Sequence, residues 1–303
     1  MVTIMIVKVR AYAKINLCLE IISARNDNYH DIYTAIQSVG LFDELEFTKR
    51  IGQGINVYVD GAIDNDQFAL INDSAQLMKN SYGKSYGADI ILQKNIPLSS
   101  GLGGGSSNAA ATILALNKLW NLDLPKESLM QIGMTVGSDV GYFIQNSGAA
   151  LVTGKGEKIQ PLNRPPTGFA LIITSKQRAM EEKTKTMFSL ITSSDFTDGS
   201  ITKSFTKVMQ NSSCWAEIYS SVEPMNCFDP YILKNSEISN IERAYVKFKE
   251  RISHAHFSGT GPSFYSIFDD HEEAVDASKT IDLNSFEVYV VPLISTPIDL
   301  HVE

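Results

Sequence analysis

Residues 95–120 read NIPLSSGLGGGSSNAAATILALNKLW, so a glycine- and serine-rich loop stands directly before an alanine- and leucine-rich run. Glycine lets the backbone fold tightly and bring several N–H groups close to a bound group. Apolar residues from Ala109 to Trp120 recur at helical spacing, which predicts a helix over 106–120. A helix N-terminus carries unsatisfied N–H groups and a partial positive charge, so this stretch predicts an anion site, most usefully a phosphate site.

The alternative interpretation of this stretch is a flexible turn followed by an ordinary capped helix. Two features weigh against it. The glycines are bounded closely by a predicted strand at 87–97 and by the helix, unlike those of a linker. The sequence also matches neither GxxxxGK[ST] nor GxGxxG in its usual strand–helix–strand setting, so another kind of nucleotide loop is needed. Ser106 and Ser107 are expected to cap the helix, or to offer hydroxyls to a phosphate or its metal.

The composition is typical of a globular chain with a sizeable core. Its 303 residues, 44% hydrophobic and 20% charged, fit one large domain or two modest ones. A net charge of −8 and a pI near 5.2 argue against a nucleic-acid partner, which usually needs a basic surface. An acidic protein can still hold a phosphate in a local loop.

The three cysteines, Cys18, Cys214 and Cys227, are too few and too widely spaced for a disulfide framework or a metal motif. They favour a reducing compartment. The first residues lack the features of a signal peptide, and no apolar run approaches the roughly 18 residues that span a bilayer. We expect a cytoplasmic chain, a monomer or homodimer, without a membrane partner.

The remaining patterns predict mixed strands and helices on either side of a boundary at 163–166, which reads Asn-Arg-Pro-Pro. Before the boundary, strands are predicted at 3–22, 31–50, 87–97 and 141–162; the first has a bend at 11–13 and the last contains glycine turns. Helices are predicted there at 71–83, 106–120 and 125–139. After it, strands are predicted at 168–174, 254–258, 264–268 and 286–293, helices at 179–191, 236–252 and 270–280, and a loop at 192–206. This second half suggests an α+β sandwich.

Several ordered segments resemble the motifs of one family, the GHMP kinases. PLSSGLGGGSSNAA at 97–110 resembles the second signature motif of that family. The other matching segments are AYAKINLCLEI at 11–21 (first motif), NDNYHDIYTAIQSV at 26–39 (substrate-binding turn), GSDVGYFI at 137–144 (segment of the catalytic aspartate) and HFSGTGPSFYSIF at 256–268 (third motif). The resemblance spans residues 8–162 well and 226–293 more loosely.

The resemblance implies an α+β, two-lobed GHMP kinase fold with the site in the cleft between the lobes. An N-terminal ribosomal-protein-S5-domain-2-like lobe, 1–162, would bind ATP and substrate, and a ferredoxin-like lobe would follow at 163–303. The implied activity is ATP-dependent, Mg²⁺-assisted phosphorylation of an alcohol. The triple glycine and the Tyr-His turn are similar to those of members that act on the 2-hydroxyl of a cytidyl-diphosphate substrate, 4-diphosphocytidyl-2-C-methyl-D-erythritol, in the non-mevalonate isoprenoid pathway.

Two other functions stay open. Another kinase of the family could act on a mevalonate-, homoserine- or sugar-type alcohol, which would make the Tyr-His turn incidental. A ligand-binding homologue without catalysis is the other alternative, and intact Lys14, Asp139 and loop glycines speak against it.

The resemblance assigns the chemistry to Asp139 as the general base and Lys14 as its cationic neighbour. Alone, Asp139 would be interpreted as a turn residue that bonds its own backbone, and Lys14 as an exposed or snorkelling strand lysine. Asn16 lies two residues after Lys14, hence on the same face of the strand. It is expected to contact the same hydroxyl or a phosphate.

The resemblance also implies which residues bind the two substrates. Expected at the nucleotide are Pro97, Gly101, Leu102, Gly103, Gly104, Gly105, Ser106, Ser107 and Asn108. Expected at the phosphate acceptor are Asn16, Tyr29, His30, Asp139, Thr184, Gly259, Thr260 and Gly261. Ser106 or Ser107 is the expected Mg²⁺ ligand; no further metal ligand is assigned.

Tyr29 and His30 would hold the cytosine ring by stacking and hydrogen bonding. Their ordinary interpretation is a turn aromatic beside a surface histidine, just as 259–261 alone would be an unremarkable hairpin turn.

Four positions depart from the family pattern. Asn28 replaces the glycine of the substrate-binding turn, and asparagine also tolerates a left-handed conformation. Gly141 stands where the family normally has proline, which should loosen the backbone beside the catalytic residue. Ala69 occupies the position of an asparagine associated with the adenine pocket. Cys227 replaces an acidic residue after Asn226.

Overall fold

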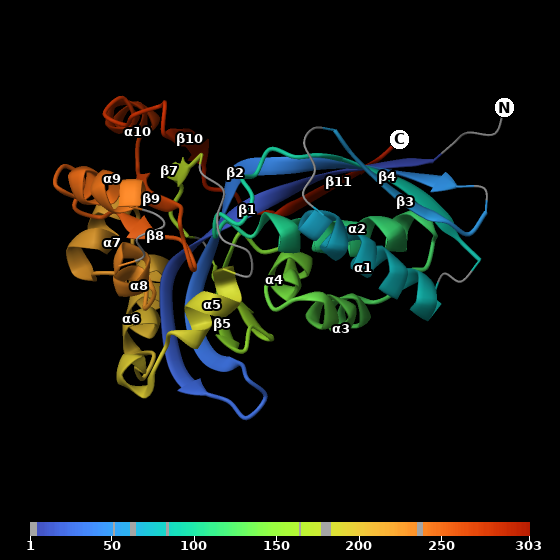
Figure 1. Cartoon of the computed structure of the whole chain (residues 1–303), viewed down its shortest axis with the longest axis horizontal. Coiled ribbons are helices and arrows are strands. Elements are labelled where there is room, and N and C mark those ends of the chain that lie inside the picture. Colours follow the sequence, from blue (N-terminus) through green and yellow to red (C-terminus); the bar gives the residue numbers. More distant parts are fainter. Residues whose placement is uncertain are drawn as a thin grey trace.

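The computed structural model describes residues 5–50, 52–60, 65–82, 85–163, 165–176, 183–234 and 239–303, which form two lobes (Figure 1). The strands are β1 (Ile6–Ala24), β2 (His30–Arg50), β3 (Ile55–Asp60), β4 (Gly87–Gln93), β5 (Ala149–Gly154), β6 (Lys158–Pro161), β7 (Phe169–Ser175), β8 (His256–Phe257), β9 (Phe264–Phe268), β10 (Phe286–Pro292) and β11 (Ile298–Val302). The helices are α1 (Asn65–Tyr82), α2 (Gly104–Leu119), α3 (Lys126–Val136), α4 (Val140–Gln145), α5 (Lys183–Ser189), α6 (Ser200–Asn211), α7 (Trp215–Ser221), α8 (Asp229–Lys234), α9 (Ser239–Lys249) and α10 (His271–Ser278), with a 3₁₀ turn at Ser193–Asp195.

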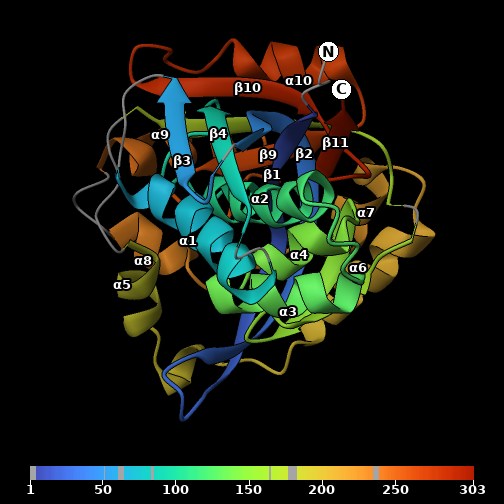
Figure 2. The same ribbon diagram turned by 90° about the vertical axis from the view of Figure 1, so that its right-hand side faces the viewer.

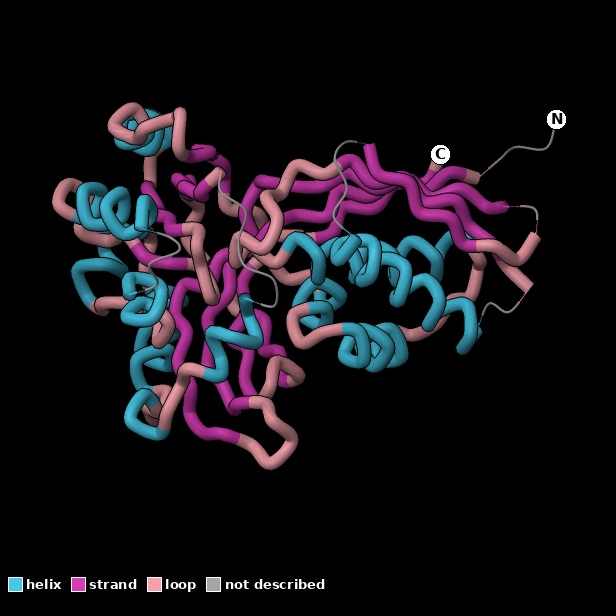
Figure 3. Tube along the Cα trace, in the orientation of Figure 1, coloured by secondary structure: helices cyan, strands magenta, loops and turns pink. Residues whose placement is uncertain are grey.

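The first lobe is a sheet covered on one face by α1–α4 (Figure 3). Within the described residues this sheet has seven strands, ordered β11-β1-β2-β4-β3, with β5 paired to β2 and β6 paired to β5. β1 and β2 form a long antiparallel hairpin whose register shifts between Tyr12 and Ala13. The predicted bend at 11–13 is therefore an irregularity inside one strand. Figure 2 shows the four helices from the side of this lobe.

The second lobe is built on an antiparallel sheet, which in the described part of the chain has the order β10-β7-β9-β8. Its strands and the helices between them follow the β-α-β-β-α-β order of a ferredoxin-like lobe. Alternate residues of β7 face two cores. Ile172 packs with residues of β1, α6 and α7, whereas Ile173 packs with residues of α8, α9 and α10. Burial on both faces explains the unbroken apolar run of this strand.

The α+β, two-lobed architecture is confirmed, and several boundaries are corrected. Residues 140–145 form α4, not a strand, since a short apolar run that is buried on all sides shows no period. Gly141 lies inside α4, where an added Cβ would stand 2.8 Å from Met134 Sδ, so this position is crowded rather than loose. Helix α1 begins at Asn65 rather than at 71.

The serine- and threonine-rich stretch 192–206 is not all loop, because α6 begins at Ser200. The carboxylate of Glu20 on β1 accepts a hydrogen bond of 2.6 Å from Thr202 N in the first turn of α6. Asp198 Oδ1, beside the N-cap Gly199, also accepts from Ser200 N at 2.9 Å, so a local signal of this helix start was present as well. Helices α7 and α8 and strand β11 were not predicted either. The predicted helix end at Gly83, the boundary residue 164, and parts of the helices predicted at 179–191 and 236–252 lie outside the described residues.

Strand β11 returns to the first sheet, where Val302 pairs with Val7 of β1. The division into 1–162 and 163–303 stays a prediction, to which the sheet adds that the first lobe includes β11. Among the described helices, none is long and apolar enough to cross a membrane.

Candidate active site

Lys14 and Asp139 come together where β1 passes the start of α4. Lys14 Nζ lies 3.6 Å from Asp139 Oδ2. The lysine side chain is 6% exposed and the aspartate side chain 39% exposed, so a buried cation faces a carboxylate that solvent or a substrate can reach. Asp139 occupies the N-cap position of α4, but its side chain makes no capping hydrogen bond. The Asp139 carboxylate is therefore free of the helix N-terminus and can interact with a bound group.

Asn16 fixes the position of the Lys14 ammonium. Lys14 Nζ donates to Asn16 Oδ1 at 2.5 Å. The Asn16 amide donates to Thr34 Oγ1 at 2.8 Å, and that hydroxyl donates to the carbonyl of Cys18 at 2.7 Å. All of these groups are buried, so the chain of hydrogen bonds holds the amide oxygen toward the lysine.

The glycine loop of the opening motif lies against Lys14. Gly103 is the N-cap of α2 in a left-handed conformation with φ of 72°, and a Cβ there would meet Lys14 Cγ at 2.9 Å. Lys14 N also donates to the carbonyl of Leu102 at 2.9 Å. The predicted capping role of Ser106 and Ser107 is wrong: both lie inside α2, because glycine adopts the left-handed N-cap at little steric cost.

The first turn of α2 suits a phosphate. Its leading N–H groups have no acceptor within the helix, and Ser107 Oγ is buried without a hydrogen-bond partner in the described structure. Ser106 is half-buried beside it. Pro97 precedes the loop, and its carbonyl accepts from Ser100 Oγ at 2.7 Å.

A second glycine loop, Ser258–Ser263, also lies close to Lys14. A Cβ on Gly259 would stand 3.2 Å from Asn16 Oδ1 and 3.6 Å from Lys14 Nζ. Ser258 Oγ donates to the carbonyl of Gly101 at 2.9 Å, and Ser263 N donates to the carbonyl of Ser100 at 3.2 Å. Gly259 and Gly261 have positive φ, and Thr260 between them is buried. The two glycine loops thus touch each other and border the same ammonium.

Two residues to which the sequence interpretation gave no role hold these loops. The Asn226 amide donates to the carbonyls of Phe257 and Gly259 at 3.0 and 2.8 Å. Asp43, the second residue, is fully buried behind the first loop.

The Asp43 carboxylate binds both ends of the segment that carries the first glycine loop. Oδ1 accepts from the backbone N–H groups of Asn95 and Ile96 at 2.7 and 2.8 Å. Oδ2 lies 2.9 Å from Lys94 Nζ and accepts from Asn108 Nδ2 at 2.9 Å. Asn108, which was expected at the nucleotide, is therefore buried and donates a hydrogen bond to Asp43. The sequence did contain a sign of this buried acid, because Asp43 alternates with Leu41 and Leu45 and so lies on the same, apolar face of β2.

Tyr29 and His30 lie at the turn between β1 and β2, away from Lys14. The His30 ring lies 5.5 Å from that of Phe188 on α5, and the Phe188 ring lies 4.9 Å from that of Phe228. Burial lowers the pKa of His30, so its imidazole is neutral at pH 7. Asn28 has φ of 64°, the left-handed conformation expected of it.

The tyrosine turn is linked to Asp139 by the β5–β6 loop. Lys155 Nζ lies 5.0 Å from the centre of the Tyr29 ring, which is 51% exposed. Next to it, a Cβ on Gly156 would stand 2.9 Å from the carbonyl of Ser138. Thr184 is exposed on α5, one turn before Phe188. The β5–β6 loop thus contacts both the Tyr29 turn and Ser138, the residue before Asp139, whereas Lys14 contacts both Asp139 and the glycine loops.

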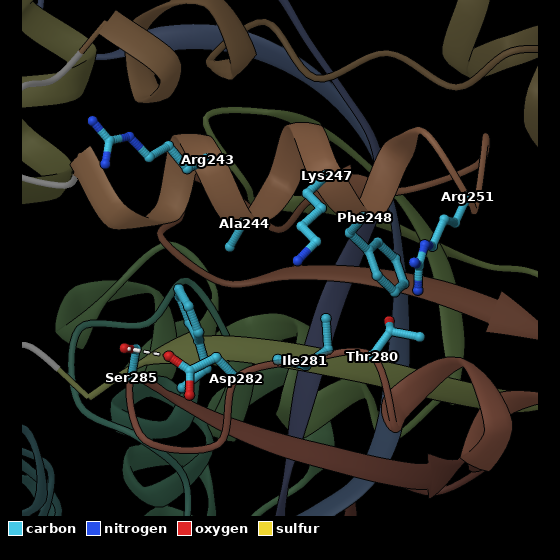
Figure 4. Close-up of a pocket in the computed structure, with 10 residues that line it drawn as sticks. Arg243, Ala244, Lys247, Phe248, Arg251, Thr280, Ile281, Asp282 and Ser285 are labelled. Carbon is cyan, nitrogen blue, oxygen red and sulfur yellow. Dashed lines mark hydrogen bonds between the residues drawn. The ribbon is translucent and has the colours of Figure 1, made fainter.

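No described group of three or more histidine, cysteine or acidic side chains could hold a metal ion by itself. Mg²⁺ is commonly bound by one or two side chains together with substrate phosphates. A hollow of about 230 Å³ lies elsewhere, between α9 and the segment Thr280–Phe286 (Figure 4). Its cations Arg243 and Lys247 are exposed, and the exposed acids Glu242 on α9 and Glu250 just after it lie nearby in the sequence, so this is a solvated helix face.

Residues 69–153 match the family described as GHMP kinases N terminal domain. Over 278 residues the chain is 34% identical to a protein of Thermoanaerobacter sp. (strain X514), covering 91% of this chain and 92% of that one. The chain belongs to the GHMP kinase family. That relative is named 4-diphosphocytidyl-2-C-methyl-D-erythritol kinase, as is one of Caldanaerobacter subterraneus subsp. tengcongensis, 33% identical over 98% of both chains. This GHMP kinase is thus a small-molecule kinase of a family that uses ATP.

Solved structures of the family agree with the fold. A 4-(cytidine 5'-diphospho)-2C-methyl-D-erythritol kinase matches with a TM-score of 0.72 at 22% identity, over 94% of this chain and 98% of that chain. A homoserine kinase from Cytophaga hutchinsonii matches with a TM-score of 0.71 at 17% identity, over 98% and 97%. Two different acceptors occur at nearly equal likeness, so the fold alone does not specify the alcohol.

Proposed function

We propose that this GHMP kinase transfers the γ-phosphoryl group of ATP to the 2-hydroxyl of 4-diphosphocytidyl-2-C-methyl-D-erythritol, as a step of isoprenoid precursor synthesis. The near-full-length relatives at 33–34% identity carry that name. The observation that carries the choice of acceptor is the pairing of His30 with Phe188 beside Tyr29. An aromatic face and a neutral imidazole suit a flat, hydrogen-bonding base such as cytosine.

In this proposal the two glycine loops and the start of α2 bind the triphosphate. The free N–H groups of the first turn and the Ser107 hydroxyl bind phosphate oxygens. Mg²⁺, when bound, would neutralise charge on the triphosphate and take Ser106 or Ser107 as a ligand. The adenine pocket is unassigned, because Ala69 stands where the family has asparagine.

The acceptor hydroxyl lies beside Asp139, whose carboxylate takes its proton as the oxygen attacks the γ-phosphorus in line. The Lys14 ammonium, held by Asn16, stabilises the negative charge of the transferring phosphoryl group. No covalent enzyme intermediate forms. A positioned general base contributes typically 10²–10⁴-fold to the rate.

The test is ADP release, measured by a coupled assay with Mg·ATP and two acceptors. One is 4-diphosphocytidyl-2-C-methyl-D-erythritol and the other is 2-C-methyl-D-erythritol 4-phosphate, which has the same alcohol without the cytidyl group. We expect turnover of the first and little of the second. His30→Ala should raise KM for the first by about tenfold, the loss of roughly 1.4 kcal/mol of binding.

The matched control for His30→Ala is His301→Ala, which removes an exposed histidine on β11. It should leave KM unchanged. Equal turnover of both acceptors, or turnover only of homoserine, mevalonate or a sugar, would reject the cytidyl substrate while keeping the kinase. An unaltered KM in His30→Ala would reject the role of the aromatic pair.

A further inference from the structure

Lys183, the first residue of α5, is almost fully buried and connects both glycine loops. Its Nζ donates to the carbonyl of Ser99 at 2.7 Å and also to the carbonyl of Gly261. Ser99 lies just before the first glycine loop, and Gly261 belongs to the second. One side chain therefore joins α5 to two segments that lie 78 and 84 residues from it in the sequence.

A lysine is a costly residue for this place. Burial, with the charge of Lys14 adding to it, lowers the pKa of Lys183 to about 7. An apolar side chain of similar length would fill the same space without that desolvation. The contribution of Lys183 to overall stability is therefore small. The effect of its ammonium is to join α5 to the carbonyls of Ser99 and Gly261.

Helix α5 carries residues on the acceptor side of the site. Phe188, five residues after Lys183, contacts the rings of His30 and Phe228. Any shift of the helix start relative to the loops would shift Phe188 relative to the phosphates. In-line phosphoryl transfer is sensitive to such shifts, since a misplacement of about 1 Å costs roughly 100-fold in rate.

We propose that Lys183 is a positioning residue, which fixes the acceptor helix α5 at a set distance from both phosphate-binding loops. The kinetic part of this proposal rests on the proposed function; the structural part does not. Lys183 touches neither substrate and acts through the carbonyls of Ser99 and Gly261.

The first test needs no substrate. Amide hydrogen exchange is measured for wild type, Lys183→Met and the control Lys176→Met. Lys176 also donates to a backbone carbonyl, that of Leu283 at 2.8 Å, but on the surface of the second lobe. In Lys183→Met we expect about tenfold faster exchange at the Gly261 and Ser263 amides, which bond the carbonyls of Ser258 and Ser100. The control should exchange like the wild type at both amides.

The second test is steady-state kinetics of the same variants. Lys183→Met should lower kcat about 10- to 100-fold, with KM for ATP and for the acceptor within about threefold of wild type. Its melting temperature should change by no more than about 2 °C. Lys183→Gln, whose amide can still donate to one or both carbonyls, should recover part of kcat.

The outcomes separate the two proposals. Unchanged exchange at both amides in Lys183→Met overturns the positioning role, whatever the activity. A tenfold higher KM for ATP with normal kcat also overturns it, since Lys183 would then bind phosphate directly. Faster exchange together with a wild type inactive on the cytidyl substrate supports the positioning role and rejects only the substrate.

Discussion

The Asp43→Asn substitution should destabilise the protein by removing the charge that pairs with Lys94. The carboxylate is fully buried and accepts hydrogen bonds from four groups, including the Lys94 ammonium 2.9 Å from Oδ2. In Asp43→Asn the ammonium stays buried beside a neutral amide, and breaking a buried pair in this way costs about 3–5 kcal/mol. With about 2 cal/mol/K of unfolding entropy per residue, 303 residues convert this into a fall in Tm of about 5–8 °C.

The neighbouring residue offers a matched control. Glu44 also pairs with a cation, Arg10 at 3.4 Å, but both side chains are about half exposed. Glu44→Gln should therefore change Tm by less than about 1 °C. Differential scanning calorimetry measures both variants, and the double variant Asp43→Asn/Lys94→Met should be more stable than the sum of the single effects. A Tm for Asp43→Asn equal to that of Glu44→Gln, or strict additivity in the double variant, would refute the reasoning.

Three further predictions concern the base, the loop contact and acid stability. Asp139→Asn should lower kcat by about 10²–10⁴-fold, while titration calorimetry should find the same affinity for an ATP analogue as in the wild type. Turnover equal to that of the wild type would reject the role of Asp139 as the general base. Gly101→Ala should abolish activity and lower Tm, because φ is +83° and the added Cβ would stand 2.3 Å from the carbonyl oxygen of Ser258. The control Gly52→Ala has φ of +103° but open space around its Cβ, so it bears backbone strain alone. Equal losses of Tm in the two variants would contradict the predicted clash. Burial lowers the pKa of His256 to about 3, so the contribution of the neutral imidazole to stability is complete above pH 6.5 and falls as the pH drops towards 3. In urea titrations over that range, the wild type should lose about 1.4 kcal/mol more unfolding free energy per pH unit than His256→Leu. Parallel curves of unfolding free energy against pH would refute this prediction.

Turn residues that bound short segments made part of the fold predictable. The strand predicted at 264–268 matches β9, and the helix predicted after Pro125 is α3. Failures occurred where a distant residue contributes or where the period is hidden. Thr202 N at the start of α6 donates to Glu20, 182 residues away in the sequence. The apolar run of α4 is buried on all sides, so its period was invisible.

The candidate site divides in the same way. Lys14, Asp139 and the glycine loops could be named because each lies in a contiguous motif. Asp43 and Lys183 could not, since their partners lie in other segments and only the fold brings them together. Phe188 was passed over because one aromatic in an amphipathic helix is normally a core residue.

The return of β11 to the first sheet affects how this chain folds as it is synthesised. Residues 298–302 complete the lobe that begins at β1, so nearly the whole second lobe must leave the ribosome before the first sheet has all its strands. Until then the outer edge of β1 is unpaired, and an exposed edge strand can pair with another chain. The exposed edge carries Lys8 and Arg10, whose charges disfavour such association during the wait.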